Sequence, residues 1–190
     1  MSACLIQYAD NGVLLPRGAC SGGYSFIMTG CPATNMLVST YMKDLMKKTK
    51  PSHAYEAIKR NHAPGGMMSY ESADDLKFYV KKGYCPGNAG KTLEWAFQDW
   101  GLSRMALRMG KKSDAALYEK RSRAWTPLFN KNIGLILPKK ENGEWLHTDP
   151  LNGQGWVEAN AWQATWSVSH DLPKLVELMG GGDAFCKKLN

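Results

Sequence analysis

Lys91 to Met109 reads KTLEWAFQDWGLSRMALRM, and this stretch decides the fold class. Residues of one helical face recur in it every three or four positions: Leu93, Ala96, Trp100, Ser103 and Leu107. Thr92 is a suitable N-cap, and Gly110 supplies the left-handed residue that commonly ends a helix. We therefore expect one long helix over the whole stretch.

Helical spacing continues on both sides of this stretch. Further helices are expected at Ala33–Lys48, from Pro51 to about Pro64, and at Ser72–Lys82, Ser113–Leu128, Trp156–Val168 and Pro173–Met179. Ser113 is expected to cap its helix, and Gly83 and residues 180–182 are expected to end theirs. Residues 8–32 are expected to be irregular or strand-like, because Gly and Pro interrupt them densely.

One β-hairpin is expected among the helices, near residues 133–146. Ile133–Leu137 has the composition of a strand, and Asn142-Gly143 is a tight-turn signal before Glu144-Trp145. Helix pairs with so little strand favour an all-α layered or toroidal domain over a parallel α/β sheet. With 190 residues, the chain is long enough for one domain with its own core.

Charge and cysteine content limit the classes of protein that fit. The chain carries 24 Lys and Arg against 17 Asp and Glu, and a net charge of +7 is one feature of nucleic-acid binders. Its lysine pairs are scattered near expected helix ends and accompany no nucleic-acid-binding motif, so a solvated surface is the better interpretation. The five cysteines show no CxxC spacing and predict neither a zinc site nor a complete disulfide framework, although one or two bridges remain open.

The sequence predicts neither a membrane span nor a signal peptide. A membrane-spanning helix needs about 18 or more apolar residues in a row, and no such run occurs. Residues 1–7 have neither the charged region nor the long apolar region of a signal peptide. If the native protein is exported, its signal is expected outside this chain.

Polar side chains interrupt the apolar run of the 91–109 helix. Glu94 and Gln98 are i,i+4 neighbours, and Asp99 lies one step further round the helix. Carboxylates are rarely fully buried without a partner, so a solvated stripe and a functional cluster are the two interpretations. His170, in Ser169-His170-Asp171, is likewise either a structural histidine or part of a site.

A second polar cluster lies among the tryptophans of residues 156–166. On the expected helix, Glu158, Trp162 and Thr165 share one face. Three tryptophan rings that exclude water from a carboxyl group would raise its pKa, and a general acid for glycosidic cleavage needs a raised pKa. Two further polar residues lie on the flank of this face: Asn160 and Gln163.

The order of these motifs resembles that of glycoside hydrolase family 92. The motifs are Gly83-Tyr-Cys-Pro86, Thr92-Leu-Glu-Trp-Ala-Phe-Gln-Asp-Trp100, Val157-Glu-Ala-Asn-Ala-Trp-Gln163, His170-Asp171 and Leu178-Met-Gly-Gly181, with looser matches at Leu15-Pro16, Met28 and Ala54-Tyr55. The resemblance covers nearly all of the chain. It implies exo-acting α-mannosidases, often specific for α-1,2 links, that invert the anomeric centre and depend on calcium.

The resemblance also implies a fold and roles for several residues. Members of the family pair an amino-terminal β-sandwich with an (α/α)6 toroid, so residues 1–190 are expected to form part of that toroid. Glu158 matches the glutamate taken as the family's general acid. Five further residues become candidates for substrate binding by their positions in the matching motifs: Asp99, Asn160, Trp162, Gln163 and His170.

The chain departs from the family pattern in several places. Ala159 and Ser169 stand where the family commonly has Gly and Pro. No stretch matches the family's Asn-Glu-Pro segment or its Asn-Asp-Asp-Cys-Gly segment, which bring the general base and calcium ligands, and the β-sandwich is absent too. We therefore assign no metal ligand within this segment and expect the segment alone to be inactive. The full-length protein is expected to be secreted or periplasmic.

The expected partner is a mannose-containing glycan, and no nucleic acid or membrane is expected. A homo-oligomer of the segment would follow if an open toroid left two groups of apolar residues bare: Leu93, Ala96, Trp100 and Leu107, and Trp162 and Trp166. The alternative function is a carbohydrate-binding or structural helical module without catalysis, in which tryptophans stack on sugars or fill the core. A nucleic-acid binder is suggested by the charge alone.

Overall fold

The computed structural model describes residues 1–12, 14–20, 23–24, 28–70 and 72–190. Its helices are α1 (Ser2–Gly12), α2 (Pro32–Met42), α3 (Pro51–Asn61), α4 (Ala73–Lys82), α5 (Ala89–Arg108), α6 (Lys112–Arg121), α7 (Ala161–Ala164), α8 (Leu172–Leu178) and α9 (Gly182–Leu189). Its strands form two antiparallel pairs, β1 (Ala19–Cys20) with β2 (Gly23–Tyr24), and β3 (Phe129–Asn130) with β4 (Leu135–Ile136). The all-α class with a small hairpin in the second half of the chain is confirmed.

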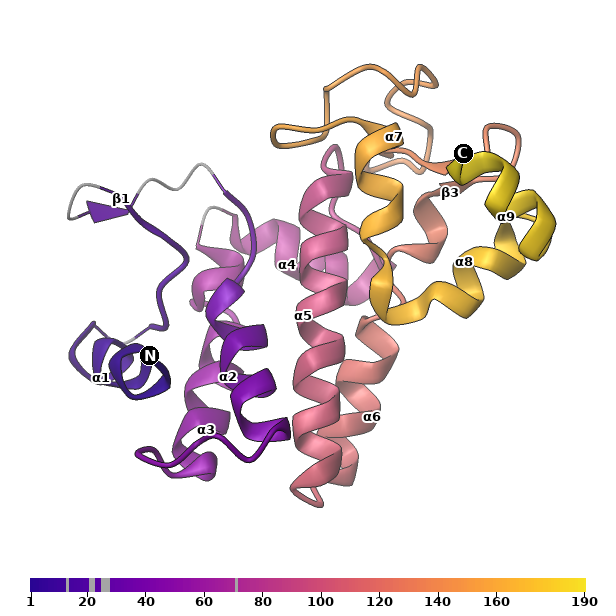
Figure 1. The fold of residues 1–190 in the computed structure, drawn as a ribbon. Coiled ribbons are helices and arrows are strands. Elements are labelled where there is room, and N and C mark those ends of the chain that lie inside the picture. The colour runs from indigo at the N-terminus through magenta and orange to yellow at the C-terminus, as the bar shows by residue number, and fades with distance from the viewer. Residues whose placement is uncertain (13, 21–22, 25–27, 71) are drawn as a thin grey trace.

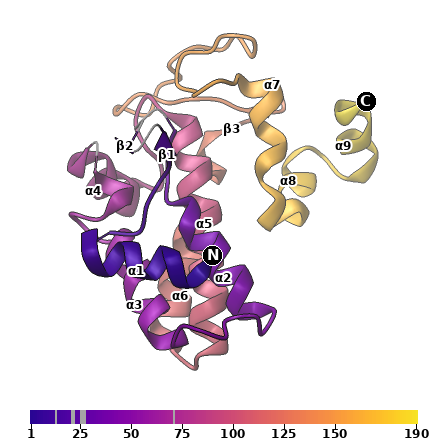
Figure 2. The same cartoon turned by 60° about the vertical axis from the view of Figure 1, so that its left-hand side comes forward.

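Helix α5 is central, and the other elements are arranged around it (Figure 1). Helices α2 and α3 lie on one side of α5, and α7 and α8 lie on the other. Helix α6 runs back along α5, because only residues 109–111 separate the two helices. Figure 2 shows α1 lying across α2 and α3.

The long helix forms where the sequence predicts it, but its cap differs. The Asn88 side chain caps α5 by accepting a hydrogen bond from the Lys91 amide at 2.8 Å. Thr92, the predicted cap, lies inside the first turn, and its hydroxyl accepts a hydrogen bond from the Cys85 amide at 2.9 Å. Gly110 has a φ of +74° and ends the helix in the left-handed conformation, as predicted.

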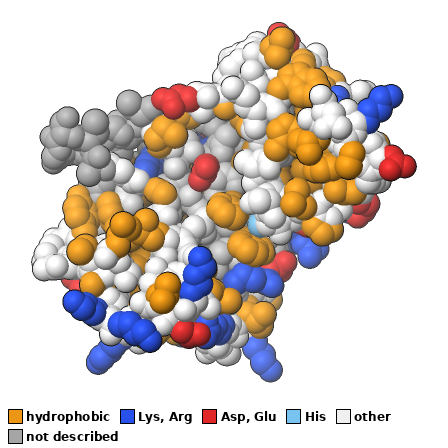
Figure 3. Space-filling view, in the orientation of Figure 1, with side chains coloured by type: hydrophobic (Ala, Val, Ile, Leu, Met, Phe, Trp, Pro, Cys, Tyr) orange, Lys and Arg blue, Asp and Glu red, His pale blue; other side chains and the backbone are white. Residues whose placement is uncertain are grey.

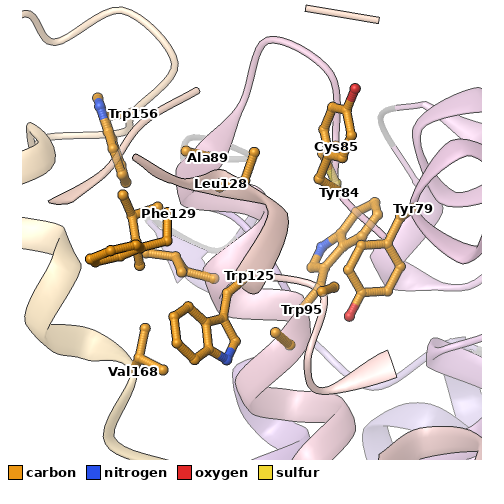
Figure 4. Close-up of a cluster of buried hydrophobic side chains, with 14 of the residues drawn as sticks. Tyr79, Tyr84, Cys85, Ala89, Trp95, Trp125, Leu128, Phe129, Trp156 and Val168 are labelled. Atoms are coloured by element: carbon orange, nitrogen blue, oxygen red, sulfur yellow. The ribbon is translucent and has the colours of Figure 1, made fainter. Parts of the chain in front are cut away.

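Two clusters of buried apolar side chains lie along α5. The cluster around its first half includes Leu93 and Ala96, and Figure 4 shows Trp125 and Trp156 packed in the same cluster from separate segments. The cluster around its second half includes Leu102 and side chains of α1, α2, α3 and α6. Because Leu93 and Ala96 are buried, the prediction that they lie on a bare face is wrong.

Several helix boundaries differ from the prediction. The segment from Ser2 to Gly12 is helical, although its second half was expected to be irregular. Helix α2 ends at Met42 rather than near Lys48, because Asp44 takes a positive φ of 57° that a helix cannot continue through. Helix α6 begins at Lys112 without a side-chain cap from Ser113, and it ends at Arg121. Helix α9 was not predicted.

The predicted hairpin region contains two turns. Strand β4 pairs with β3, which precedes it, so that Phe129 lies opposite Ile136. The Asn142-Gly143 turn is also present, and it brings Lys139 and Trp145 together as an isolated antiparallel bridge. The Asn142 side chain accepts a hydrogen bond from the Glu144 amide at 3.0 Å, which stabilises the turn.

Candidate active site

Glu158 lies in a loop, with its backbone in the left-handed region. Its φ is +52°, a value that side-chain-bearing residues adopt at a cost on the order of 1–3 kcal/mol. Helix α7 begins only at Ala161, so the predicted helical face shared by Glu158 and Trp162 is wrong. Residues in such conformations persist where neighbouring contacts impose them, and they cluster at functional sites.

Close backbone contacts hold the loop in front of Glu158. Gly155 has a φ of +87°, and a Cβ there would lie 2.7 Å from Pro138 and 3.0 Å from the Gly87 carbonyl oxygen. The Gly90 amide donates a hydrogen bond to the Gly155 carbonyl at 3.2 Å. The backbone of Trp156 then covers Gly90, whose Cβ position lies 3.6 Å from the Trp156 Cα. The loop is therefore attached to the first turn of α5.

The residues that follow Glu158 are also fixed. The Asn160 side chain caps α7 by accepting a hydrogen bond from the Gln163 amide at 3.1 Å. The buried Thr165 hydroxyl donates to the Ala161 carbonyl at 2.7 Å and accepts from the Ile136 amide at 3.0 Å, which ties α7 to β4. Glu158 therefore lies between two segments that the core holds in place.

The three tryptophans expected around Glu158 have different surroundings. Trp156 is buried in the core, and the ring of Trp166 packs edge-on against Phe185 at a centroid distance of 5.7 Å. Trp162 is 37% exposed, and the Lys188 ammonium lies 4.8 Å from its ring centre. Glu158 itself is exposed, so the described residues do not enclose its carboxyl group among three indole rings. Gln163 is exposed as well.

Asp99 is fully buried in a polar network inside the fold. Its Oδ1 accepts a hydrogen bond from His62 Nδ1 at 2.8 Å. Its Oδ2 accepts from the Tyr79 hydroxyl at 2.9 Å and from Arg121 Nε at 2.7 Å. On the far side of the imidazole, His62 Nε2 lies 2.9 Å from the Thr34 hydroxyl. This position does not fit the direct sugar contact predicted for Asp99, which instead joins α5 to three other elements.

His170 forms a hydrogen bond that links the segment after α7 to the end of α6. Its Nε2 lies 3.0 Å from the Ser122 carbonyl, which can only accept, so Nε2 carries the proton. Burial lowers the pKa of His170, although the hydrogen bond to Ser122 opposes this. The imidazole lies 5.8 Å from the Phe97 ring and 6.2 Å from the Trp100 ring, measured between centroids.

The face of the molecule that Figure 3 shows is hollowed. Phe97 and Trp100 stack on each other with ring centroids 6.0 Å apart and planes 10° from parallel. Both line a groove of about 430 Å³ between α5 and α2, together with Val38 and Met42. The loop that precedes Glu158 thus contacts the first turn of α5, and the half-buried rings of Phe97 and Trp100 lie further along the same helix.

Comparison with known proteins agrees with this arrangement. The family model for the catalytic domain of glycosyl hydrolase family 92 matches residues 1–190, the whole sequence. The chain belongs to glycosyl hydrolase family 92. An inverting mannosidase of family 92 from Bacteroides thetaiotaomicron VPI-5482 is 27% identical and superposes with a TM-score of 0.90 over 100% of this chain.

Two other relatives match over a similar share of the chain. A family 92 α-mannosidase from Bacteroides thetaiotaomicron, 24% identical, has the same fold, with a TM-score of 0.86 over 100% of this chain. An uncharacterized secreted glycosidase from Arthroderma benhamiae is 24% identical over 227 residues, which cover 98% of this chain. The chain spans 26% of each of the two bacterial structures and 29% of the fungal relative.

The described part of this family 92 chain does not provide a calcium site by itself. Calcium takes about six to eight oxygen ligands, with carboxylates prominent among them. Within the described ranges, no three His, Cys, Asp or Glu side chains come together as a metal site. The side-chain oxygen of Asn160, one of the polar groups near Glu158, is already used in capping α7. The residues present therefore do not fit a complete site.

Two further predictions concern cysteines and membrane spans. Where the structure describes cysteine side chains, all are free thiols: Cys4, Cys31, Cys85 and Cys186. Across the described ranges, none of the helices combines the length and the apolar composition that crossing a membrane requires.

Gly90 and Gly155 hold the Glu158 loop on α5, but neither glycine was among the residues predicted to be functional. A usable signal was present, since Gly153 and Gly155 lie directly before the family 92 motif that contains Glu158. Paired glycines in a loop indicate positive φ or a close backbone approach, and Gly155 has both.

Proposed function

We propose that this family 92 chain is part of the catalytic domain of an exo-acting α-mannosidase. The enzyme removes α-linked mannose from glycans, with α-1,2 links as its substrates, and it inverts the anomeric centre. Glu158 is its general acid. The observation that carries this role is the conformation of Glu158. Its side chain is exposed, its backbone is left-handed, and it follows a loop that two close contacts hold against α5.

The acid role follows from the chemistry of the glycosidic bond. A general acid donates its proton to the leaving-group oxygen as the bond breaks, and an inverting enzyme uses a second carboxylate to activate water on the opposite face. The two carboxyl groups lie about 6.5–9.5 Å apart in such enzymes. An exposed glutamate on a fixed loop can reach a leaving group, whereas the fully buried Asp99 cannot.

The remaining residues have supporting roles in this proposal. Trp162 offers an exposed ring on which a sugar face can stack, and Gln163 offers an exposed amide beside it. Asn160 positions the start of α7, and His170 positions the segment behind it. The helices belong to an (α/α)6 toroid that pairs with a β-sandwich, and the calcium requirement is a property of the whole enzyme. The secreted fungal relative supports export of the full-length protein.

The test is hydrolysis by the full-length enzyme. It should release mannose from α-1,2-linked mannobiose and from an aryl α-mannoside, but not from the matching β-mannoside. Chelation should abolish the activity, and added calcium should restore it. The 190-residue chain alone should be inactive, since none of its residues is assigned as the general base. If the full-length protein binds mannosides without hydrolysing them, the carbohydrate-binding alternative holds.

A further inference from the structure

Glu94 lies on the face of α5 that carries the Glu158 loop. Gly90, which Trp156 covers, stands four residues before Glu94. Residues four apart on a helix lie on the same face, about 5–6 Å from each other. Side chains on a helix also lean toward its amino-terminal end, which for Glu94 is the direction of the Trp156 contact. Glu94 is thus the first carboxylate on α5 beyond the point where the loop is attached.

The Glu94 carboxylate is held by Gln98. Gln98 Nε2 donates a hydrogen bond to Glu94 Oε2 at 2.9 Å. Gln98 is 1% exposed, and its Oε1 accepts a hydrogen bond from the Cys31 amide at 2.6 Å. Because a backbone amide can only donate, this contact fixes which end of the Gln98 side chain is oxygen. The amide nitrogen must then point at Glu94.

Gly30 makes this arrangement possible. Its φ is +77°, and a Cβ there would lie 2.6 Å from Gln98 Nε2 and 2.8 Å from Gln98 Oε1. The chain before α2 therefore packs directly against the Gln98 amide, in space that a side chain at residue 30 would occupy. A carboxylate that is oriented in this way loses little side-chain entropy when a ligand binds it.

Glu94 still has an unused acceptor. One of its oxygens accepts from Gln98, while Oε1 has no hydrogen-bond partner among the residues that the structure describes. Glu94 is exposed, but nearby protein atoms desolvate part of its carboxyl group; this raises the pKa of Glu94, although the hydrogen bond from Gln98 opposes the shift. A half-desolvated acceptor gains more from a hydrogen bond than a fully solvated one does.

Aromatic rings flank Glu94 on the same helix face. Phe97 follows it by three residues and stacks on Trp100, with His170 against both rings. Sugars present an apolar C–H face and a rim of hydroxyl groups, which suit an aromatic ring next to a carboxylate. If Glu94 were only part of a solvated polar stripe, it would need neither the buried Gln98 side chain nor the neighbouring aromatic rings.

We propose that Glu94 is a substrate-binding residue whose carboxylate accepts a hydrogen bond from one hydroxyl group of the mannoside. Gln98 is its positioning residue. This inference rests on the proposed function, since it assigns a sugar hydroxyl to the site that contains Glu158.

The experiment measures kcat/KM of the full-length enzyme on an aryl α-mannoside and on its 2-, 3-, 4- and 6-deoxy analogues. Glu94→Ala should lower kcat/KM on the parent mannoside about 10- to 100-fold, the usual effect of losing a hydrogen bond to a charged group. On the analogue that lacks the bound hydroxyl, Glu94→Ala should cause little further loss. Glu94→Gln keeps the shape of the side chain and should lower kcat/KM less than Glu94→Ala does. The same comparison of substrates is made with Glu94→Gln if the alanine variant does not fold.

Glu56→Ala is the matched control, because Glu56 is an exposed glutamate on α3 with only a loose contact to Lys111 at 3.9 Å. Glu56→Ala should leave kcat/KM unchanged on the parent mannoside and on all four deoxy analogues. If the Glu94 variants lose the same factor on the parent and on every analogue, the role is structural and the inference is overturned. If they behave as Glu56→Ala does, it is overturned as well. A wild-type enzyme without activity on any mannoside would instead overturn the proposed function, and the inference with it.

Discussion

Glu158→Gln in the full-length enzyme is expected to lower kcat/KM at least 100-fold, and up to about 10,000-fold, on a mannoside with a poor leaving group. Glutamine keeps the shape and hydrogen-bonding capacity of the side chain but has no proton to donate. On an aryl mannoside whose leaving group departs without protonation, the loss should be much smaller. The measurement is the ratio of kcat/KM for the two substrates, in wild type and variant.

The ratio separates acid catalysis from other roles of Glu158. Gln163→Ala is a useful control, because Gln163 is an exposed side chain near the same loop and is proposed to contact the sugar without donating a proton. A residue that binds the sugar should change both substrates by the same factor. Equal losses for Glu158→Gln on the two substrates would therefore contradict the general-acid role.

Asp99→Asn is expected to destabilise the fold by about 3–5 kcal/mol, as the removal of one member of a buried ion pair usually does. Asparagine preserves the shape but leaves the Arg121 guanidinium, which is 11% exposed, without its counter-charge. Its amide would also place donors where His62 and Tyr79 now donate. Chemical denaturation of the 190-residue chain measures the free energy of unfolding directly.

The matched control is Asp74→Asn on α4. Asp74 pairs with Lys77 at 2.9 Å, but its side chain is 89% exposed. Solvent screening leaves such a pair worth about 0–1 kcal/mol, so this variant should unfold almost as the wild type does. A loss below about 1 kcal/mol for Asp99→Asn would show that the network around α5 does not stabilise the fold as described.

Local signals predicted those helices whose ends are set by neighbouring residues. Helix α4 is an example, because Ser72 accepts a hydrogen bond from the Asp75 amide at 3.1 Å and Gly83 ends the helix with a φ of +84°. Helix α5 was predicted for the same reason, but its cap was not. The Thr92 hydroxyl accepts a hydrogen bond from the Cys85 amide, and Asn88 caps the helix instead.

The predictions were wrong where contacts between residues distant in the sequence determine the local structure. Glu158 has the spacing of a helical residue, yet the packing of Gly155 against Pro138 holds its loop outside the helix. Asp99 is buried because three donors reach it: His62 at the end of α3, Tyr79 from α4 and Arg121 from α6. No pattern within the α5 motif distinguishes that position from a solvated one.

If Glu158 works in an inverting α-mannosidase, the mannose released first has the β configuration, opposite to that of the α-linked substrate. Proton NMR can follow an aryl α-mannoside, which releases a single mannose, during the first minutes of hydrolysis by the full-length enzyme, before mutarotation mixes the anomers. We expect β-mannose to appear first, since water attacks the face opposite the leaving group that Glu158 protonates. Release of α-mannose first, or no release of mannose, would contradict it.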